Sequence, residues 1–421
     1  MNDALKKEFR EYVLDLEKSG VDIDAGAFLS AMAEPPCVSV KINRRKCSDP
    51  AETGYEGLQP VAWCNSGFYL PERPQFTLNP LLHAGVFYVQ DASSMIHETL
   101  IGRILPLVSS ATPAVLDLCA APGGKTTSMI NALPDGSLVV ANEFDRKRSS
   151  ILRENLLKWG YPDVIATSSP TSAFAKAGPR FDIVAVDAPC SGEGMMRKDD
   201  DARRQWSEGL VRQCAELQRT ILADAIDALR PGGFLIYSTC TFNPVENEQQ
   251  LLRLRDEKGL IPFDPQLPPE WGIGRQISGD IPALRFMPHL TRGEGQFAAI
   301  LRKPEDGDDR GGNHSKTAEA VRKTARVILD GIPRTEMKGK TEMPTSEWAL
   351  STDFPADRYP RAEVDLATAL SYLRHEAIRL PGDTPTGPVA ICYKGHPLGM
   401  AKNLGSRANN LYPAAWRIRN L

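Results

Sequence analysis

The sequence predicts a doubly wound α/β domain with a parallel sheet, preceded by an N-terminal α+β region and followed by a small C-terminal domain. Short runs dense in apolar and β-branched residues, such as AVLDLCA and FDIVAVDAP, recur between residues 115 and 301. Such runs are typical of strands that are buried on both faces. Helical stretches, for example 144–159 and 210–230, separate them, and this alternation favours a parallel sheet covered by helices.

Four segments are expected along the 421 residues. Residues 1–98 combine an amphipathic leading helix with short extended pieces such as CVSVKINRRK. The α/β domain occupies 99–302 and ends in GQFAAILRK, a predicted late edge strand. Residues 303–316 are charged and glycine-rich, which is typical of a linker. The C-terminal region, 317–421, is locally basic, with seven Lys/Arg against two acids from residue 372 onward.

Composition limits the class of protein. The chain is 42 % hydrophobic and 24 % charged, with a net charge of −3, which is ordinary for a soluble globular protein. Any contact with nucleic acid must therefore come from local basic patches. The eight cysteines form no CxxC pair, which argues against a disulfide framework and a zinc site. The sequence contains no recognisable signal peptide or membrane span, so we expect a cytoplasmic monomer without metal.

The loop after the first predicted strand of the α/β domain, VLDLCAAPGGKTTSMI, predicts a cofactor site. Its glycine pair lets backbone approach a ligand at a helix N-terminus. A Walker A motif requires glycine where Cys119 stands, and the dinucleotide fingerprint fails because 119–124 reads CAAPGG. Glu143, after the next strand, is placed to accept hydrogen bonds from a ribose. A ribose without a pyrophosphate suggests S-adenosylmethionine; the alternative is a tight turn with an incidental acid.

Two cysteines follow two predicted neighbouring strands. Asp187 and Cys190 lie at the carboxyl end of the fourth strand, and Cys240 lies at the same end of the fifth. Ligands bind at this edge of open α/β sheets, and adjacent strands are about 4.8 Å apart, so both thiols can face one cavity. The alternative for each cysteine is a small buried hydrophobe.

A thiol, a carboxylate and a methyl donor together suit methylation of carbon 5 of a pyrimidine. A thiolate that adds to carbon 6 makes carbon 5 nucleophilic, which divides one difficult step into easier ones. Asp187 is the candidate acid at ring nitrogen N3. Asn243, Pro244 and Glu246 predict a helix cap that fixes the loop of Cys240, although a purely structural role for them stays open.

Several blocks of sequence resemble the NOL1/NOP2/Sun family of RNA cytosine-5 methyltransferases. These blocks are DLCAAPGGKTT, DAPCSGEGMMRKD, STCTFNPVENE, HAGVFYVQDASSM and RFMPHLTRGEGQFAAIL. The tail PLGMAKNLGSRANNLYPAAWRIRN resembles the PUA-like domain of bacterial members that act on small-subunit ribosomal RNA. The resemblance spans nearly the whole chain. It implies a Rossmann-like class I methyltransferase with an N-terminal RNA-binding region and a PUA-like C-terminal domain.

The resemblance also implies roles for individual residues. Cys240 is expected to be the nucleophile, Cys190 to help release the product, and Asp187 to contact both cofactor and base. The expected S-adenosylmethionine site comprises Cys119, Ala120, Ala121, Pro122, Gly123, Gly124, Lys125, Glu143 and Asp187, with Lys125 also near the reacting atoms. The sequence departs from the family where an acid is expected near adenine, since Ser168 and Ser169 stand there, and where Asp200 replaces a proline.

The expected partner is ribosomal RNA, free or in the small ribosomal subunit. Phosphate contacts that position it are predicted from three groups of residues. These are Lys41, Arg44, Arg45 and Lys46; Arg197 and Lys198; and Lys394, Lys402, Arg407, Arg417 and Arg419 with Tyr393, Tyr412 and Trp416. His83 and His289 are expected to be structural.

Two other functions stay open at this point. The first is a DNA cytosine-5 methyltransferase, in which Cys190 would attack the base. The second is a non-catalytic RNA-binding factor of ribosome assembly that retains a cofactor fold.

Overall fold

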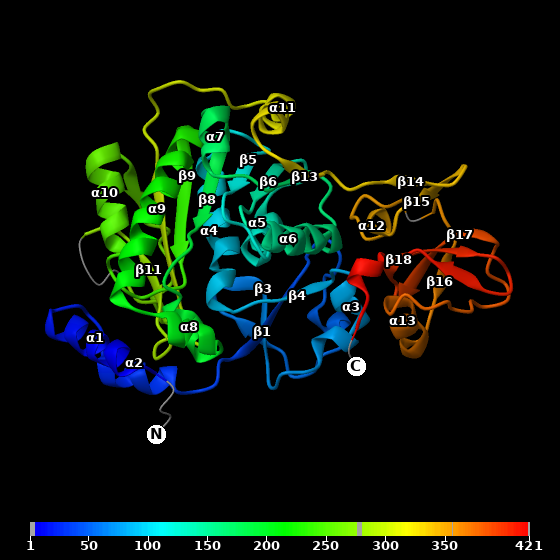
Figure 1. The fold of residues 1–421 in the computed structure, drawn as a ribbon, viewed down its shortest axis with the longest axis horizontal. Helices are drawn as coiled ribbons and strands as arrows, with labels where there is room; N and C mark the ends of the chain where they lie inside the picture. Colours follow the sequence, from blue (N-terminus) through cyan, green and yellow to red (C-terminus); the bar gives the residue numbers. More distant parts are fainter. Residues whose placement is uncertain (1–4, 276–279, 356, 420–421) are drawn as a thin grey trace.

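The computed structural model describes residues 5–275, 280–355 and 357–419 (Figure 1). A central α/β domain is flanked by an N-terminal sheet and by a C-terminal domain that forms one end of an elongated molecule (Figure 1). The first four residues of the predicted N-terminal region and the last two of the predicted C-terminal region lie outside the described residues. No helix among the described residues is long and apolar enough to cross a membrane.

The central sheet contains the five predicted parallel strands. They are β5 (Ala114–Asp117), β6 (Leu138–Asn142), β7 (Val164–Thr167), β8 (Phe181–Asp187) and β9 (Leu229–Thr239). Their order, β9-β8-β5-β6-β7, places the first strand in the middle, with the chain continuing in opposite directions on either side of it. Such a switch point opens a crevice at the carboxyl ends of the strands.

Helices cover both faces of this sheet, as predicted. One face carries α4 (Ile96–Ile104), α5 (Gly124–Ala132) and α6 (Arg146–Trp159); the other carries α7 (Ser172–Ala177), α9 (Glu208–Ala228), α10 (Glu248–Lys258) and α11 (His314–Thr324). Alternate strand residues point into the two cores: Val115 packs with the first group and Leu116 with the second. This burial on both faces explains why the strands are continuous apolar runs.

The two edges of the sheet differ from the prediction. β12 (Gln296–Arg302) was expected at an edge, but it lies between β9 and β10 (Ile261–Phe263), and β11 (Leu284–Phe286) also pairs with it. The prediction was wrong because three-residue strands are too short to give a periodic signal. At the opposite edge β13 (Val327–Asp330) pairs antiparallel with β7.

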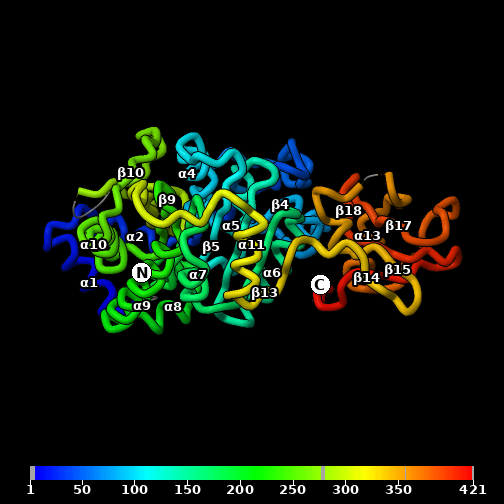
Figure 2. The backbone as a smooth tube through the Cα atoms, turned by 90° about the horizontal axis from the view of Figure 1, so that it is seen from above, coloured from blue at the N-terminus to red at the C-terminus, as the bar shows by residue number. Residues whose placement is uncertain are grey.

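The segment after β12 is tied to the central domain. Figure 2 shows it crossing this domain to α11, which packs against α7. Lys303 Nζ donates to the carbonyl oxygens of Ile226 and Leu229, each at 2.7 Å. The Arg230 guanidinium pairs with Asp309. Residues predicted as a linker and the start of the C-terminal region therefore extend the α/β layer.

The N-terminal region forms a four-stranded antiparallel sheet in the order β2-β3-β1-β4. Its strands are β1 (Val38–Ile42), β2 (Gln59–Val61), β3 (Cys64–Leu70) and β4 (Phe87–Val89), and its helices are α1 (Lys7–Lys18), α2 (Ala25–Met32) and α3 (Pro80–His83). The amphipathic α1 buries Phe9, whose ring lies 4.9 Å from that of Trp206, just after α8 (Asp200–Gln205). The leading helix thus packs against the segment that follows β8 in the central domain.

The C-terminal domain is built on the sheet β16-β17-β18-β19. Its elements are β14 (Thr335–Lys338), β15 (Thr341–Pro344), α12 (Ser346–Ala349), β16 (Arg361–Glu363), α13 (Leu366–Leu373), β17 (Gly387–Tyr393), β18 (His396–Asn403) and β19 (Ala408–Asn410). The buried Tyr372 fixes α13 to the sheet, because its hydroxyl donates to the Met400 carbonyl at 2.9 Å.

Candidate active site

The two predicted cysteines meet at the carboxyl edge of the central sheet. β8 and β9 are parallel neighbours, and Asp187 lies opposite Ser238 in their register. Cys240 directly follows β9 and Cys190 lies three residues after β8, which brings their Sγ atoms to 3.2 Å. Both line a cavity of about 840 Å³. The prediction that the two thiols share one cavity is confirmed.

Two buried carboxylates join the loops that carry these cysteines. Glu193, in the Cys190 loop, accepts from the backbone amides of Phe242 at 2.7 Å and Asn243 at 3.1 Å in the Cys240 loop. Glu246, in the Cys240 loop, accepts from the Ser191 amide at 3.0 Å. Both side chains are almost inaccessible to solvent. Because each loop supplies the acceptor for the other's amides, the spacing of the sulfurs is fixed from both sides.

The prediction that Asn243 caps a helix was wrong, because α10 begins at Glu248 with Asn247 as its N-cap residue, and Asn243 instead closes a turn. Asn243 Oδ1 accepts from the Glu246 amide at 2.9 Å, and its Nδ2 donates to Glu246 Oε1 at 2.8 Å. The segment between them is a turn, and α10 starts at Glu248. The second bond of a capping box is absent, since the Asn243 amide donates to Glu193, and Glu246 also accepts from Ser191; these bonds therefore hold the loop and not a helix end.

Asp187 and Lys125 form an ion pair in the same cavity. Lys125 Nζ lies 2.7 Å from Asp187 Oδ2. Burial alone would lower the pKa of Lys125, but the neighbouring Asp187 carboxylate raises the pKa overall. Ser238 Oγ donates to the other Asp187 oxygen, Oδ1, at 2.9 Å. Both carboxylate oxygens are thus held in place at the end of β8.

The cavity extends from the cysteines to the glycine-rich loop. Of the residues predicted to bind a cofactor, all but Gly123 line it: Cys119, Ala120, Ala121, Pro122, Gly124, Lys125, Glu143 and Asp187. Gly123 has φ +109° and caps α5, and a Cβ there would lie 3.3 Å from Leu152 Cδ1. It therefore turns the chain into the helix from behind the cavity wall.

Comparisons with known proteins bear on this arrangement. Family models match residues 5–92 (N-terminal domain of 16S rRNA methyltransferase RsmF), 104–302 (16S rRNA methyltransferase RsmB/F) and 359–418 (methyltransferase RsmF PUA domain). The ribosomal RNA small subunit methyltransferase F of Erwinia tasmaniensis is 32 % identical over 446 residues, covering 92 % of this chain and 91 % of that protein. The chain belongs to this methyltransferase family. The predicted resemblance is thereby confirmed.

Further relatives agree with this assignment. The ribosomal RNA small subunit methyltransferase F of Aeromonas hydrophila is 29 % identical and covers 98 % of this chain and 97 % of its own. The crystal structure of NSun6 from Pyrococcus horikoshii superposes with a TM-score of 0.60 at 20 % identity, over 73 % of this chain and 100 % of that chain. The structural match supports the predicted Rossmann-like methyltransferase fold.

This methyltransferase uses S-adenosylmethionine, and the residues present fit that cofactor. Glu143 is buried, and its Oε2 has no hydrogen-bond partner in the described structure, although the Arg148 guanidinium lies 3.3 Å away. The ion pair leaves Oε2 free to accept a hydrogen bond from a ligand, as ribose hydroxyls would supply. Phe144, which is 69 % exposed, lines the same end of the cavity and offers an apolar face to adenine.

Ser168 and Ser169, which stand where the family is expected to have an acid near adenine, do not line this cavity. Ser169 Oγ accepts from the Arg326 amide at 2.7 Å, and its own amide donates to Asn142. Pro170 and Thr171 line the cavity in their place. The two serines instead join β7 to the start of β13, a contact that sequence reasoning missed because β13 was assigned to another region.

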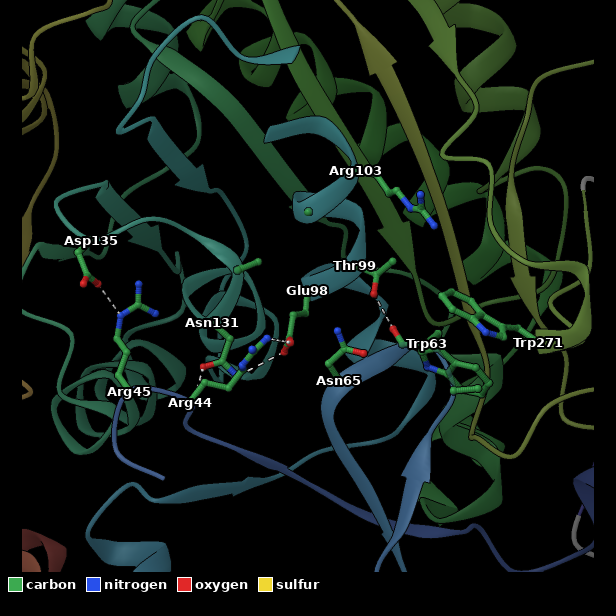
Figure 3. A pocket seen from close by; sticks show the side chains of 13 residues that line it. Arg44, Arg45, Trp63, Asn65, Glu98, Thr99, Arg103, Asn131, Asp135 and Trp271 are labelled. Carbon is green, nitrogen blue, oxygen red and sulfur yellow. Dashed lines mark hydrogen bonds and ion pairs between the residues drawn. The ribbon is translucent and has the colours of Figure 1, made fainter. Parts of the chain in front are cut away.

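The predicted basic cluster at 41–46 is mostly internal. Lys41 is fully buried, and burial lowers the pKa of Lys41 to about 7. Lys46 Nζ donates to the carbonyls of Ala84 and Lys158, at 2.8 and 2.7 Å. Arg45 is paired with Asp135, and only Arg44 is largely exposed (Figure 3). The prediction that this cluster binds phosphate groups was therefore wrong. The reason is that Lys41 lies on a strand, β1, and its side chain points into the protein.

Figure 3 shows where these arginines lie. They face a separate hollow of about 710 Å³ between the N-terminal sheet and α4, with Glu98 and Trp271. Among the described residues, none lines both this hollow and the catalytic cavity. Arg44 lies 3.7 Å from Glu98 across it.

The other two predicted RNA-contacting groups are partly structural as well. Arg197 donates to the carbonyls of Gly293 and Pro35, and Lys198 pairs with Glu294 at the cavity rim. In the C-terminal domain Tyr412 and Trp416 are buried, so the predicted aromatic surface is reduced to Tyr393. Four of the five cations predicted to contact RNA in this domain are exposed: Lys394, Arg407, Arg417 and Arg419.

Proposed function

We propose that this methyltransferase transfers a methyl group to carbon 5 of a cytidine in RNA, through a covalent bond between Cys240 and carbon 6 of the base. The observation that carries the proposal is the pair of sulfurs 3.2 Å apart in the cavity that also holds the cofactor loop. Two thiols at reacting distance from one base allow one to attack and the other to assist release.

The proton distribution between the thiols supports Cys240 as the nucleophile. The pKa of Cys190 is raised, first by its hydrogen bond with Cys240 and then by burial. Cys190 therefore stays a thiol, and Cys240, whose Sγ lies 3.2 Å away, is the sulfur proposed to attack the base. The Lys125 ammonium, held by Asp187, adds positive charge beside both sulfurs.

The chain's own groups account for the steps on the base. The Cys240 thiolate forms a bond to carbon 6, the ring double bonds shift toward N3, and N3 takes a proton from the ion pair of Lys125 and Asp187. Carbon 5 is then electron-rich. When bound, S-adenosylmethionine supplies the methyl group from its sulfonium centre. Loss of the carbon 5 proton to water in the cavity, with return of the N3 proton to the ion pair, then lets the thiolate leave, and Cys190 lies at the sulfur that departs.

The substrate is proposed to be small-subunit ribosomal RNA. The support is the name of the relatives, together with the N-terminal and PUA domain models that flank the catalytic domain. A base in a loop or an opened helix can be turned out into the cavity at small cost, which suits an RNA target.

Bisulfite sequencing of total ribosomal RNA, with and without this protein, tests the target. One or more cytidines should lose protection when the gene is absent and regain it with the wild-type chain. No change at any ribosomal cytidine, with RNA binding retained, would favour a non-catalytic assembly factor.

Serine substitutions at each sulfur test the mechanism. Cys240→Ser should abolish methyl transfer, by about 10³-fold or more. Cys190→Ser should retain a covalent protein–RNA adduct that survives denaturing electrophoresis, because release is impaired. The reverse pattern, with the adduct only in Cys240→Ser, would overturn the assignment and support attack by Cys190, as in a DNA cytosine-5 methyltransferase.

A further inference from the structure

A mostly buried carboxylate lies in the catalytic cavity beside Cys240. Glu294, just before β12, lines this cavity, and its side chain is 13 % exposed. Its Oε2 is paired with Lys198 Nζ at the cavity rim. Among the residues that the structure describes, no second group bonds to this carboxylate. The other oxygen, Oε1, is therefore left for water or substrate.

The backbone of Glu294 passes close to that of Cys240. β12 pairs antiparallel with β9, so the segment before β12 continues beside the segment after β9. Gly194 lies against both segments, since a Cβ on it would lie 3.0 Å from the Cys240 carbonyl oxygen and 3.1 Å from that of Glu294. Adjacent strands are about 4.8 Å apart. Asp187 after β8, Cys240 after β9 and Glu294 before β12 can therefore all reach one base.

The order of these groups matches the atoms of a cytosine ring. N3 and carbon 6 lie at opposite corners of the ring, and carbon 5 is next to carbon 6. With N3 at the ion pair of Lys125 and Asp187, and carbon 6 at the Cys240 sulfur, the carbon 5 side of the ring points toward β12. Glu294 therefore lies on the side of the ring that carries the carbon 5 proton.

We propose that Glu294 is the general base of product release, and that its carboxylate takes up, through one water molecule, the carbon 5 proton of the methylated adduct. A general base acts within hydrogen-bond reach of the proton or through one water. The proposal rests on the proposed function, since it is that reaction that leaves both a methyl group and a proton on carbon 5. Cys190 keeps its place at the departing sulfur.

The step is balanced in atoms and electrons. Water takes the carbon 5 proton and passes one of its own to Glu294 Oε1. The electron pair of the C5–H bond forms the double bond between carbons 5 and 6, and the pair of the C6–S bond leaves with the Cys240 sulfur as a thiolate. The N3 proton returns to the ion pair of Lys125 and Asp187. Glu294 then loses its proton to solvent water.

The charges around Glu294 suit a base. The groups that face it are Asp91, which follows β4, and Lys198 and Arg197 from the segment after β8. Burial, followed by Asp91, raises the pKa of Glu294, whereas Lys198 and Arg197 oppose the rise and favour the ionised form. A carboxylate with a raised pKa is a stronger base. Because only the ionised form accepts a proton, adduct release should slow as the pH falls through this pKa.

The test follows the covalent adduct formed from methyl-labelled S-adenosylmethionine and ribosomal RNA from cells that lack this protein. In Glu294→Gln, labelled adduct should form within about 3-fold of the wild-type rate, because attack and methyl transfer do not use the carboxylate. Its conversion to free methylated RNA should slow by about 100-fold at pH 8.5, since a general base contributes about 10²–10⁴-fold. Denaturing electrophoresis of samples quenched over time, at saturating RNA, measures both rates.

Lys198→Met separates a base from a structural ion pair, because it breaks the same pair from the other side. Without the ammonium group the pKa of Glu294 should rise further, so adduct release should slow about 10-fold at pH 6 but less than about 3-fold at pH 8.5. Glu294→Gln should show the opposite trend, with its largest loss at high pH, where the wild-type carboxylate is ionised. A purely structural pair would give both variants the same loss at every pH.

Glu154→Gln is the matched control. Glu154 is also partly buried and paired with a lysine, Lys158, but it does not line the catalytic cavity. The substitution should leave both adduct formation and adduct release unchanged at pH 6 and at pH 8.5.

Failure of this proposal differs from failure of the proposed function. A wild-type enzyme that forms 5-methylcytidine, with a Glu294→Gln variant that forms no adduct or releases it as fast as wild type, would overturn the role of Glu294 alone. Equal losses in Glu294→Gln and Lys198→Met at every pH would do the same. A wild-type enzyme that forms no 5-methylcytidine would overturn the proposed function and the base with it.

Discussion

The loops of the two cysteines and the segment 41–46 both gather charged side chains, but they use them in opposite ways. In the loops, Glu193 and Glu246 accept backbone amides, and this holds two reactive sulfurs at a cavity wall. In the segment, Lys41 and Lys46 donate to internal oxygens and leave little positive charge for a ligand. A charged residue near a predicted site is therefore informative only when its surroundings are known.

The largest expected loss of stability and activity comes from substitution of Glu193 in the cysteine loops. Glu193→Ala leaves the amides of Phe242 and Asn243, and the indole nitrogen of Trp206, without their acceptor. We expect the free energy of unfolding to fall by about 3 kcal/mol or more, since each unsatisfied buried donor costs about 1–3 kcal/mol. Methyl transfer should fall by about 100-fold, because the sulfur spacing is lost. Urea unfolding and single-turnover assays measure the two effects.

Glu208 provides the control for this prediction. It lies at the start of α9 and is 65 % exposed, in an ion pair with Arg212. Glu208→Ala should change the free energy of unfolding by less than about 0.5 kcal/mol. Equal effects of the two substitutions would show that the bonds between the loops do not hold the site.

The catalytic edge was largely predictable from the sequence because its signals are local. Continuous apolar runs identified the parallel strands, and in such a sheet the residues after adjacent strands must share an edge. That argument placed Cys190, Cys240, Asp187 and Glu143 without coordinates. Gly123, Ser168 and Ser169 were expected at the cofactor site but do not line the cavity. Which residues of a turn face a cavity depends on what packs behind the turn, and the sequence does not show this.

What the sequence did not reveal depends on contacts between distant segments. His97 contacts Ser238, which is 141 residues away in the sequence. β13 pairs with β7, and the paired residues are 160 or more positions apart. Neither contact follows from periodicity or from a motif. Likewise, the inward direction of Lys41 depends on acceptors from α5 and from Gln90, just after β4, that no local pattern predicts.

Within the basic segment, substitutions at Lys41 and Arg44 should differ in their effect on the free energy of unfolding, by less than the effect of Glu193→Ala. Lys41 Nζ donates to Gln90 Oε1 and to the Gly124 carbonyl, each at 2.8 Å, and so ties β1 to the cofactor loop. Lys41→Met should lower the free energy of unfolding by about 2 kcal/mol, because these buried acceptors lose their donor. Arg44→Ala, at an exposed side chain with a 3.7 Å ion pair, should cost less than about 0.5 kcal/mol.

Cofactor affinity sharpens the same comparison. Since Gly124 and Gln90 line the catalytic cavity, Lys41→Met should also weaken binding of S-adenosylmethionine several-fold, measured by calorimetry. Arg44→Ala should leave that affinity unchanged. A Lys41→Met protein as stable as wild type, with the same affinity, would mean that the buried lysine does not support the loop.

The smallest expected effect concerns the exposed cations of the C-terminal domain. Lys394 and Arg407 are exposed, as a phosphate contact requires. Replacing both with alanine should weaken RNA binding about 3- to 10-fold at 150 mM salt and reduce the slope of log affinity against log salt by about one to two, since each phosphate contact releases counterions. The single-turnover rate at saturating RNA should not change, because both residues lie outside the catalytic cavity.

Arg219→Ala removes one positive charge from α9 and should leave the salt slope unaltered. An unaltered slope in the double variant would instead place the RNA on another face, and the C-terminal domain would then resemble the segment 41–46, basic in sequence but not in use.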